Sequence, residues 1–150
     1  GSGVAVVAYQ RAEPRVSADA CFDEGCRLEA SDAEAARAAY ERALAADPAH
    51  APSAANLGRL LHLGGKLDAA ERVYRAGIAR CGPEPLLLFN LGVLLEEQGR
   101  YEEACAAYEG SIAVQPDFAD SHYNLGLLYE ILGDRRKGLR HLKRYRQLVR

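Results

Sequence analysis

The sequence predicts an all-α protein, an α-solenoid of four helix–turn–helix repeats. Three observations lead to this fold. The tripeptide Asn-Leu-Gly recurs at a constant interval. Seven residues after the glycine of each tripeptide comes another glycine. The apolar residues within each repeat have helical rather than alternating spacing. The tripeptides begin at Asn56, Asn90 and Asn124, and the later glycines are Gly65, Gly99 and Gly133.

Composition limits the class of protein. The chain has 150 residues, of which 49% are hydrophobic and 27% charged, which excludes a disordered or collagen-like chain. The net charge of −2 indicates no overall attraction to nucleic acid or membranes. The chain contains no methionine, and Gly1-Ser2-Gly3 is typical of a cloning remnant. We therefore expect a piece of a longer protein, with the remnant and a linker over residues 1–17.

The first repeat, about residues 18–50, is the irregular copy. Its second helix is clear, with Ala36, Tyr40 and Leu44 before Pro48. Gly25 lies one position closer to Gly58 than the regular interval requires, so one residue is missing near the turn at residues 30–32. Terminal repeats are commonly atypical because they cap the array.

The other three repeats span about residues 51–84, 85–118 and 119–150. In each, a glycine is predicted to end the first helix, and proline marks the link between repeats. A glycine in the middle of each first helix costs ~1 kcal/mol relative to alanine, which indicates that the facing helix must approach closely there. These glycines and the residues expected to face them are Gly58 with Tyr74, Gly92 with Tyr108, and Gly126 with Leu142.

This pattern resembles the tetratricopeptide repeat family. The third repeat fits the family pattern best, with Leu88, Leu91-Gly92, Leu95, Gly99, Ala104, Tyr108 and Pro116, and with Ser111 where alanine is usual. The resemblance covers residues 18–150 and implies a right-handed superhelix that serves as a protein-interaction scaffold. It does not identify the partner.

The candidate site is the concave surface that the stacked first helices are expected to form. The three asparagines lie on the side of each first helix opposite its packing stripe. Asparagine offers a donor and an acceptor, so it suits the N–H and C=O groups of an extended peptide, and the ladder resembles that of O-linked N-acetylglucosamine transferases. The predicted peptide-binding residues are Asn56, Arg59, His62, Phe89, Asn90, Val93, Glu97, Tyr123, Asn124, Leu127 and Glu130.

Alternatives remain for this surface. The asparagines would equally serve as hydrogen-bonding partners of a neighbouring helix or of water. The apolar residues would equally pack between adjacent first helices; they are Phe89, Val93, Tyr123 and Leu127. A clamp for an acidic peptide terminus is disfavoured, because Arg59 is the single strong cation on a surface that is otherwise acidic.

The C-terminal segment, residues 134–150, is strongly basic. It contains eight Lys or Arg against one Asp, a net of +7, so the rest of the chain carries −9. A solvated terminal helix explains part of this charge. The functional alternatives are docking on an acidic surface, including that of another copy, or contact with phosphates, although no aromatic platform for nucleic acid accompanies the charge. The predicted basic surface comprises Arg136, Lys137, Arg140, Lys143 and Arg144.

No motif for catalysis, cofactor or metal binding stands out, so we predict a protein that is not an enzyme and has no cofactor. The four cysteines form no CxxC pair, which favours free thiols in a reducing cytoplasm. The predicted partner is a protein or peptide, with self-association as a further option; direct nucleic-acid binding and membrane insertion are not expected.

Two other functions stay open. Segments such as residues 56–62 and 139–146 resemble the repeats that follow a winged helix-turn-helix domain in bacterial regulators of the mercury-resistance type. That resemblance implies an oligomerisation or regulatory domain of a DNA-binding transcription regulator. The chain would alternatively be the targeting arm of a larger enzyme.

Overall fold

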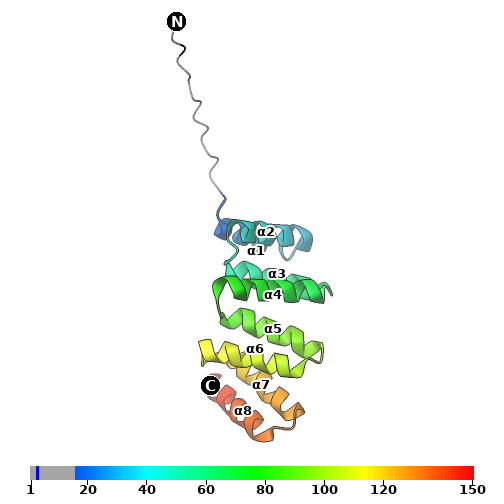
Figure 1. Ribbon diagram of the computed structural model, residues 1–150, viewed down its shortest axis with the longest axis vertical. Coiled ribbons are helices and arrows are strands. Elements are labelled where there is room, and N and C mark those ends of the chain that lie inside the picture. Colours follow the sequence, from blue (N-terminus) through cyan, green and yellow to red (C-terminus); the bar gives the residue numbers. More distant parts are fainter. Residues whose placement is uncertain (1–2, 4–15) are drawn as a thin grey trace.

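The computed structural model describes residue 3 and residues 16–150, and this part of the chain forms eight α-helices. The helices pair in antiparallel fashion and stack in chain order along the long axis of the molecule (Figure 1). Most of the predicted linker, residues 1–17, lies outside the described residues. The helices are α1 (Ala18–Leu28), α2 (Ala33–Ala46), α3 (Ala51–Leu63), α4 (Leu67–Cys81), α5 (Pro85–Glu97), α6 (Tyr101–Val114), α7 (Ala119–Ile131) and α8 (Arg135–Leu148).

Local chemistry explains where the helices begin and end. The Ser17 hydroxyl accepts a hydrogen bond from the Ala20 N–H at 3.1 Å and so caps α1. The turns after α3, α5 and α7 each contain a glycine with φ between 73° and 85°, a conformation that glycine adopts without strain. The first repeat departs from this pattern, as expected: α1 has 11 residues where α3, α5 and α7 have 13, and its turn holds no glycine.

The close approach expected within each repeat is confirmed. A Cβ atom on Gly92 would lie 2.6 Å from a ring carbon of Tyr108, which is fully buried. No side chain larger than hydrogen fits there unless the ring moves. The same arrangement holds in every repeat, through the pairs Gly25–Tyr40, Gly58–Tyr74, Gly92–Tyr108 and Gly126–Leu142.

Neighbouring repeats pack through a second set of small residues. Ser111 of α6 and Ser121 of α7 are both fully buried, and their hydroxyl groups share a hydrogen bond of 2.8 Å. Gly77 of α4 lies against Leu87 of α5, where an added Cβ atom would be 3.3 Å from the Leu87 Cδ1 atom. Among the described residues no buried side-chain nitrogen or oxygen lacks a partner, so the interior is fully hydrogen-bonded.

All four cysteines have free thiols. Cys21 and Cys105 are buried within the helix stack, while Cys26 and Cys81 are exposed. Burial raises the pKa of the Cys105 thiol to about 11, which leaves it protonated and unreactive at neutral pH.

Candidate protein-binding surface

The predicted peptide-binding residues lie on α3, α5 and α7, the first helices of the second, third and fourth repeats. We call the surface that these eleven residues form the first-helix face. The constant repeat interval places Asn56, Asn90 and Asn124 at the same position of each helix, and all three are half-buried.

Two of the asparagines are held by the preceding repeat. The side-chain amide of Asn56 donates to the Tyr40 hydroxyl at 3.2 Å, and that of Asn124 donates to the Tyr108 hydroxyl at the same distance. The first-helix asparagine thus bonds to a neighbouring helix, one of the two roles left open by the sequence. Asn90 forms no such bond within residues 16–150, and in that range the side-chain oxygens of all three asparagines accept no hydrogen bond.

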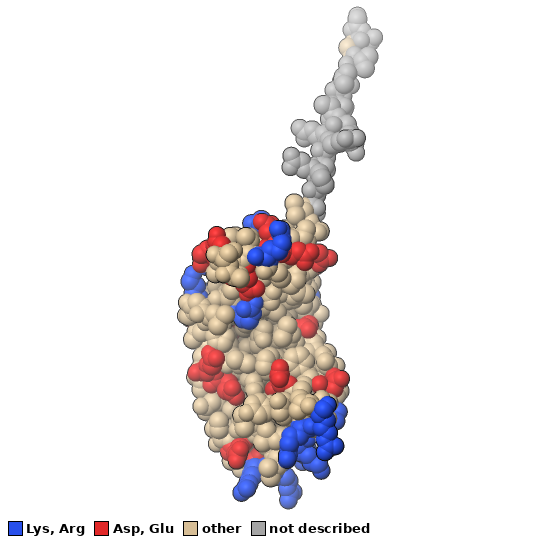
Figure 2. Space-filling view, turned by 180° about the vertical axis from the view of Figure 1, so that it is seen from behind, with Lys and Arg blue, Asp and Glu red and all other residues tan. Residues whose placement is uncertain are grey.

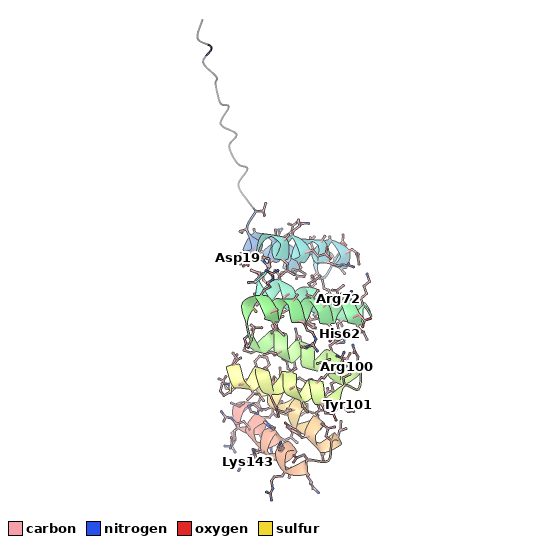
Figure 3. All side chains as sticks on the ribbon, in the orientation of Figure 1. Asp19, His62, Arg72, Arg100, Tyr101 and Lys143 are labelled. Atoms are coloured by element: carbon pink, nitrogen blue, oxygen red, sulfur yellow. The ribbon has the colours of Figure 1, made fainter. Side chains whose placement is uncertain are left out.

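Ion pairs link adjacent first helices across this face. Arg59 of α3 contacts the carboxylate of Glu29, just after α1. His62, marked in Figure 3, lies at the C-terminal end of α3 and contacts Glu97 of α5. Burial, with repulsion from Glu97, raises the pKa of the neighbouring Glu96. Since Arg59 already has a carboxylate partner, it offers no free cation to an anionic ligand.

The apolar residues divide into packed and accessible ones. Phe89 is half-buried, and its ring centroid lies 5.9 Å from that of Tyr108 and 5.5 Å from that of Phe118. Phe89 thus packs against α6 and the residue before α7, which differs from the packing between adjacent first helices that the sequence left open. Leu127 and Tyr123 of α7 are 38% and 42% exposed and form an apolar strip near the C-terminal end of the face, in which one side of the Tyr123 ring packs on Tyr145 of α8 at a centroid distance of 4.9 Å.

Some residues that complete this surface were not among the predicted ones. Ile131 is 64% exposed and follows Leu127 by four residues, so it extends the apolar strip by one helical turn. That spacing is visible in the sequence. Glu29, the partner of Arg59, is distant in the chain and belongs to the irregular first repeat, so no regular spacing points to it.

The five residues of the predicted basic surface all lie on α8 and are exposed. Figure 2 shows Lys and Arg gathered at the C-terminal end of the molecule. Lys137 lies 4.0 Å from Asp134 and places its ammonium group 5.3 Å from the centre of the Tyr129 ring. Among the described residues, no other cation of this helix pairs with a carboxylate.

A histidine pair, with His122 buried and His141 half-buried, joins α7 to α8. The Nδ1 atoms of His122 and His141 are 3.0 Å apart, and His122 Nε2 lies 2.8 Å from the carbonyl oxygen of Pro116. If His122 donates to that carbonyl, its Nδ1 accepts the proton of His141. Burial, together with His122 and the cations Arg140 and Lys137, lowers the pKa of His141. The pair is a structural contact within the last repeat.

Two further findings concern residues 16–150. No group of three or more His, Cys, Asp or Glu side chains is arranged to hold a metal ion there. None of the helices has the length and apolar character needed to cross a membrane.

Three comparisons place the chain among known proteins. Models described as tetratricopeptide repeat match residues 27–80 and 70–113, and one described as TPR repeat matches residues 94–133, so the matches run together over residues 27–133. None of the curated proteins matches the sequence.

Among solved structures, a crystal structure of MamA aligns with a TM-score of 0.77 at 20% identity, covering 87% of this chain and 77% of that one. A fragment of MamA from Desulfovibrio magneticus RS-1 aligns with a TM-score of 0.72 at 18% identity, over 87% of this chain and 75% of that one. At such identities the likeness concerns the fold alone, which is an α-solenoid. Together with its repeated Gly–Tyr contacts and the family matches, this shows that the chain belongs to the tetratricopeptide repeat family.

Proposed function

We propose that the first-helix face binds an extended peptide or partner segment. The observation that carries this proposal is the position of Leu127 and Tyr123, which are exposed apolar side chains beside half-buried asparagines whose side-chain oxygens accept no hydrogen bond within residues 16–150. Exposed apolar residues next to oriented polar groups are typical of recognition sites. The amide of Asn90 is the freest of the three, since no tyrosine holds it.

The charges of the face favour a particular class of peptide. Glu130 is exposed and Arg59 is paired with Glu29, while Glu97 is exposed but contacts His62. The preferred ligand is therefore an extended segment with one apolar side chain for the strip and a lysine or arginine near it. Each asparagine contact adds roughly 0.5–1.5 kcal/mol, so we expect micromolar affinity.

This role requires no catalytic group, cofactor or metal, and we propose that the chain is a non-enzymatic scaffold. Free thiols fit a reducing compartment such as the cytoplasm. The cation-rich α8 supports a second candidate, an oligomerisation or regulatory domain of a larger DNA-binding regulator. A targeting arm of a larger enzyme would use the same first-helix face.

A library of random peptides of about 12 residues, displayed on phage, tests the proposal. We expect the selected peptides to share an apolar residue flanked by Lys or Arg. Leu127→Asp should abolish binding, and Asn90→Ala should weaken it by about two- to tenfold. Val114→Asp is the matched control, because Val114 is 46% exposed near the end of α6 and lies outside the face. The proposal fails if no peptide is enriched, or if binding survives Leu127→Asp.

A further inference from the structure

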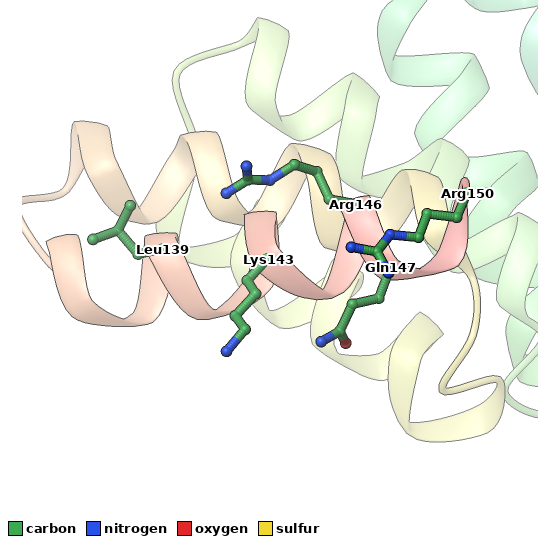
Figure 4. A pocket seen from close by; sticks show the side chains of 5 residues that line it. All are labelled: Leu139, Lys143, Arg146, Gln147 and Arg150. Atoms are coloured by element: carbon green, nitrogen blue, oxygen red, sulfur yellow. The ribbon is translucent and has the colours of Figure 1, made fainter.

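One side of α8 combines cations with an exposed leucine. Leu139, Lys143, Arg146 and Arg150 follow one another at intervals of three or four residues and therefore share one stripe, which continues just past the end of the helix. Together with Gln147 they line an open hollow of about 590 Å³ (Figure 4). Leu139 is 56% exposed, and within residues 16–150 none of the three cations pairs with a carboxylate. We call these five residues the α8 stripe.

The repeat period shows that the α8 stripe occupies a position that receives a helix elsewhere in the solenoid. One repeat earlier in the chain, Leu139 and Lys143 correspond to Cys105 and Glu109 of α6. Cys105 is buried, and Glu109 accepts a hydrogen bond from Tyr129 of α7, the first helix of the following repeat. This side is thus covered by a helix on α6, whereas the corresponding leucine of α8 is exposed. A helix antiparallel to α8 is the element that fits the stripe.

The same register states which residues of such a helix would meet the cations. His122 of α7 places its Nε2 atom 2.8 Å from the carbonyl oxygen of Pro116, and Arg150 takes the place of Pro116 one repeat later. Seven residues after His122 comes Tyr129, whose counterpart would meet Lys143. Positions seven residues apart lie on the same side of a helix. One docked helix can therefore present a carboxylate to each cation.

The residue that would meet Leu139 is expected to be apolar. Arg37 of α2 is the counterpart of Leu139, and it lines a hollow of about 320 Å³ together with Leu60 and Leu61 of α3. Leu60 corresponds to the fully buried Leu128 of α7, which directly precedes the residue that meets the second cation position. A leucine just before the second acidic residue would therefore cover Leu139.

The first helices of this chain lack that pattern. Within residues 16–150, none of the four carries an acidic residue at either of the two positions. In α1 the positions hold Cys21 and Leu28, and the cation Arg27 stands where the leucine is needed. A separate acidic segment is therefore favoured over a second copy. The exposed Leu139 also favours a protein segment over a phosphate backbone, which would leave that leucine without an apolar partner.

We propose that the α8 stripe binds an acidic amphipathic helix of another protein, which docks antiparallel to α8 as a further first helix of the solenoid. The bound helix carries Asp or Glu at two positions seven residues apart and an apolar residue just before the second of them. Binding is expected to weaken with salt, because the opposite charges supply most of the complementarity. The site is separate from the first-helix face.

Fluorescence anisotropy with a labelled synthetic peptide and the full chain tests this proposal. The probe is an alanine-rich peptide of about 20 residues, long enough to form a helix, with Glu at the two positions and Leu before the second. The control peptide has the same composition, with both Glu residues moved to the opposite side of the helix. In about 50 mM NaCl we expect the probe to bind at least about tenfold more tightly than the control, and the difference to shrink in about 500 mM NaCl.

Variants of the chain separate the stripe from the general charge of α8. Lys143→Glu/Arg150→Glu should abolish binding of the probe and should bind a peptide with Lys in place of both Glu residues, which also shows that the variant is folded. Arg136→Glu/Arg140→Glu is the matched control, because it reverses two exposed cations of α8 outside the stripe. This control should bind the probe as the unchanged chain does.

Four outcomes would overturn the proposal. The probe and the control peptide would bind equally, the control variant would lose binding as fully as the stripe variant, or the stripe variant would fail to bind the Lys peptide. The fourth outcome is that Lys143 and Arg150 serve another occupant while the probe stays unbound. Sedimentation equilibrium would then show association of the chain with itself through these residues, or a labelled DNA duplex would bind through them.

Discussion

The contact between Gly92 and Tyr108 leads to a prediction about two glycine-to-alanine substitutions in the third repeat. One should lower the free energy of unfolding and the other should raise it. Gly92→Ala improves the helix propensity of α5 by ~1 kcal/mol. It also introduces a Cβ atom 2.6 Å from the fully buried Tyr108 ring, whose hydroxyl is fixed by Asn124. Overpacking of this kind costs about 1–3 kcal/mol. We therefore expect a net loss of up to about 2 kcal/mol in the free energy of unfolding.

Gly110→Ala is the matched control. Gly110 also lies within a helix of the third repeat, but a Cβ atom there would be 3.4 Å from the nearest atom, Leu88 Cδ1, which is an ordinary contact. We expect this variant to gain about 0.5–1 kcal/mol from propensity alone. Urea unfolding followed by circular dichroism and tyrosine fluorescence measures both, since the chain has eight tyrosines and no tryptophan. A Gly92→Ala variant that gains as much stability as Gly110→Ala would refute the packing argument.

Three further predictions concern stability and reactivity. Asn124→Ala should lower the free energy of unfolding by about 0.5–1.5 kcal/mol in urea titrations, because the buried Tyr108 hydroxyl loses its partner; no loss would mean that the bond is not formed in solution. Because the pKa of His141 is lowered in the folded chain, the unfolded chain binds more protons, and stability should decrease as pH falls below the ordinary histidine value of about 6.5 and level off below the lowered pKa. Thermal unfolding at several pH values checks this, and a slope that is unchanged in His141→Gln would contradict it. A thiol reagent at neutral pH should label the two exposed cysteines and spare Cys21 and Cys105 until urea is added, and rapid labelling of all four would argue against the buried positions.

The sequence predicted the packing of the repeats well, because packing within a repeat depends on short, regular spacings. Gly92 and Tyr108 are separated by the same interval as Gly58 and Tyr74, and a glycine in the middle of a helix has few explanations besides close approach. The irregular first repeat follows the same logic, with Gly25 against Tyr40.

The contacts of the first-helix face were harder to predict, because a side chain there can contact a neighbouring repeat or remain in solvent. The period places Asn56 on the first-helix face, but whether its amide meets Tyr40 or solvent depends on how the preceding second helix approaches. Phe89 likewise contacts Phe118, which lies between two repeats and outside the repeated pattern. Its role as a ligand contact or a packing residue was therefore open until both neighbours were placed.

Titration of the isotope-labelled chain with a selected peptide, followed by ¹⁵N nuclear magnetic resonance, tests the binding role of the first-helix face most directly. The side-chain amide signals of Asn56, Asn90 and Asn124 report on the face itself. We predict that the signal of Asn90 shifts most, since that amide is not held by a tyrosine, and that backbone signals of α5 and α7 shift with it. Shifts confined to α8 or to the second helices, with the asparagine signals unchanged, would contradict the proposed binding surface.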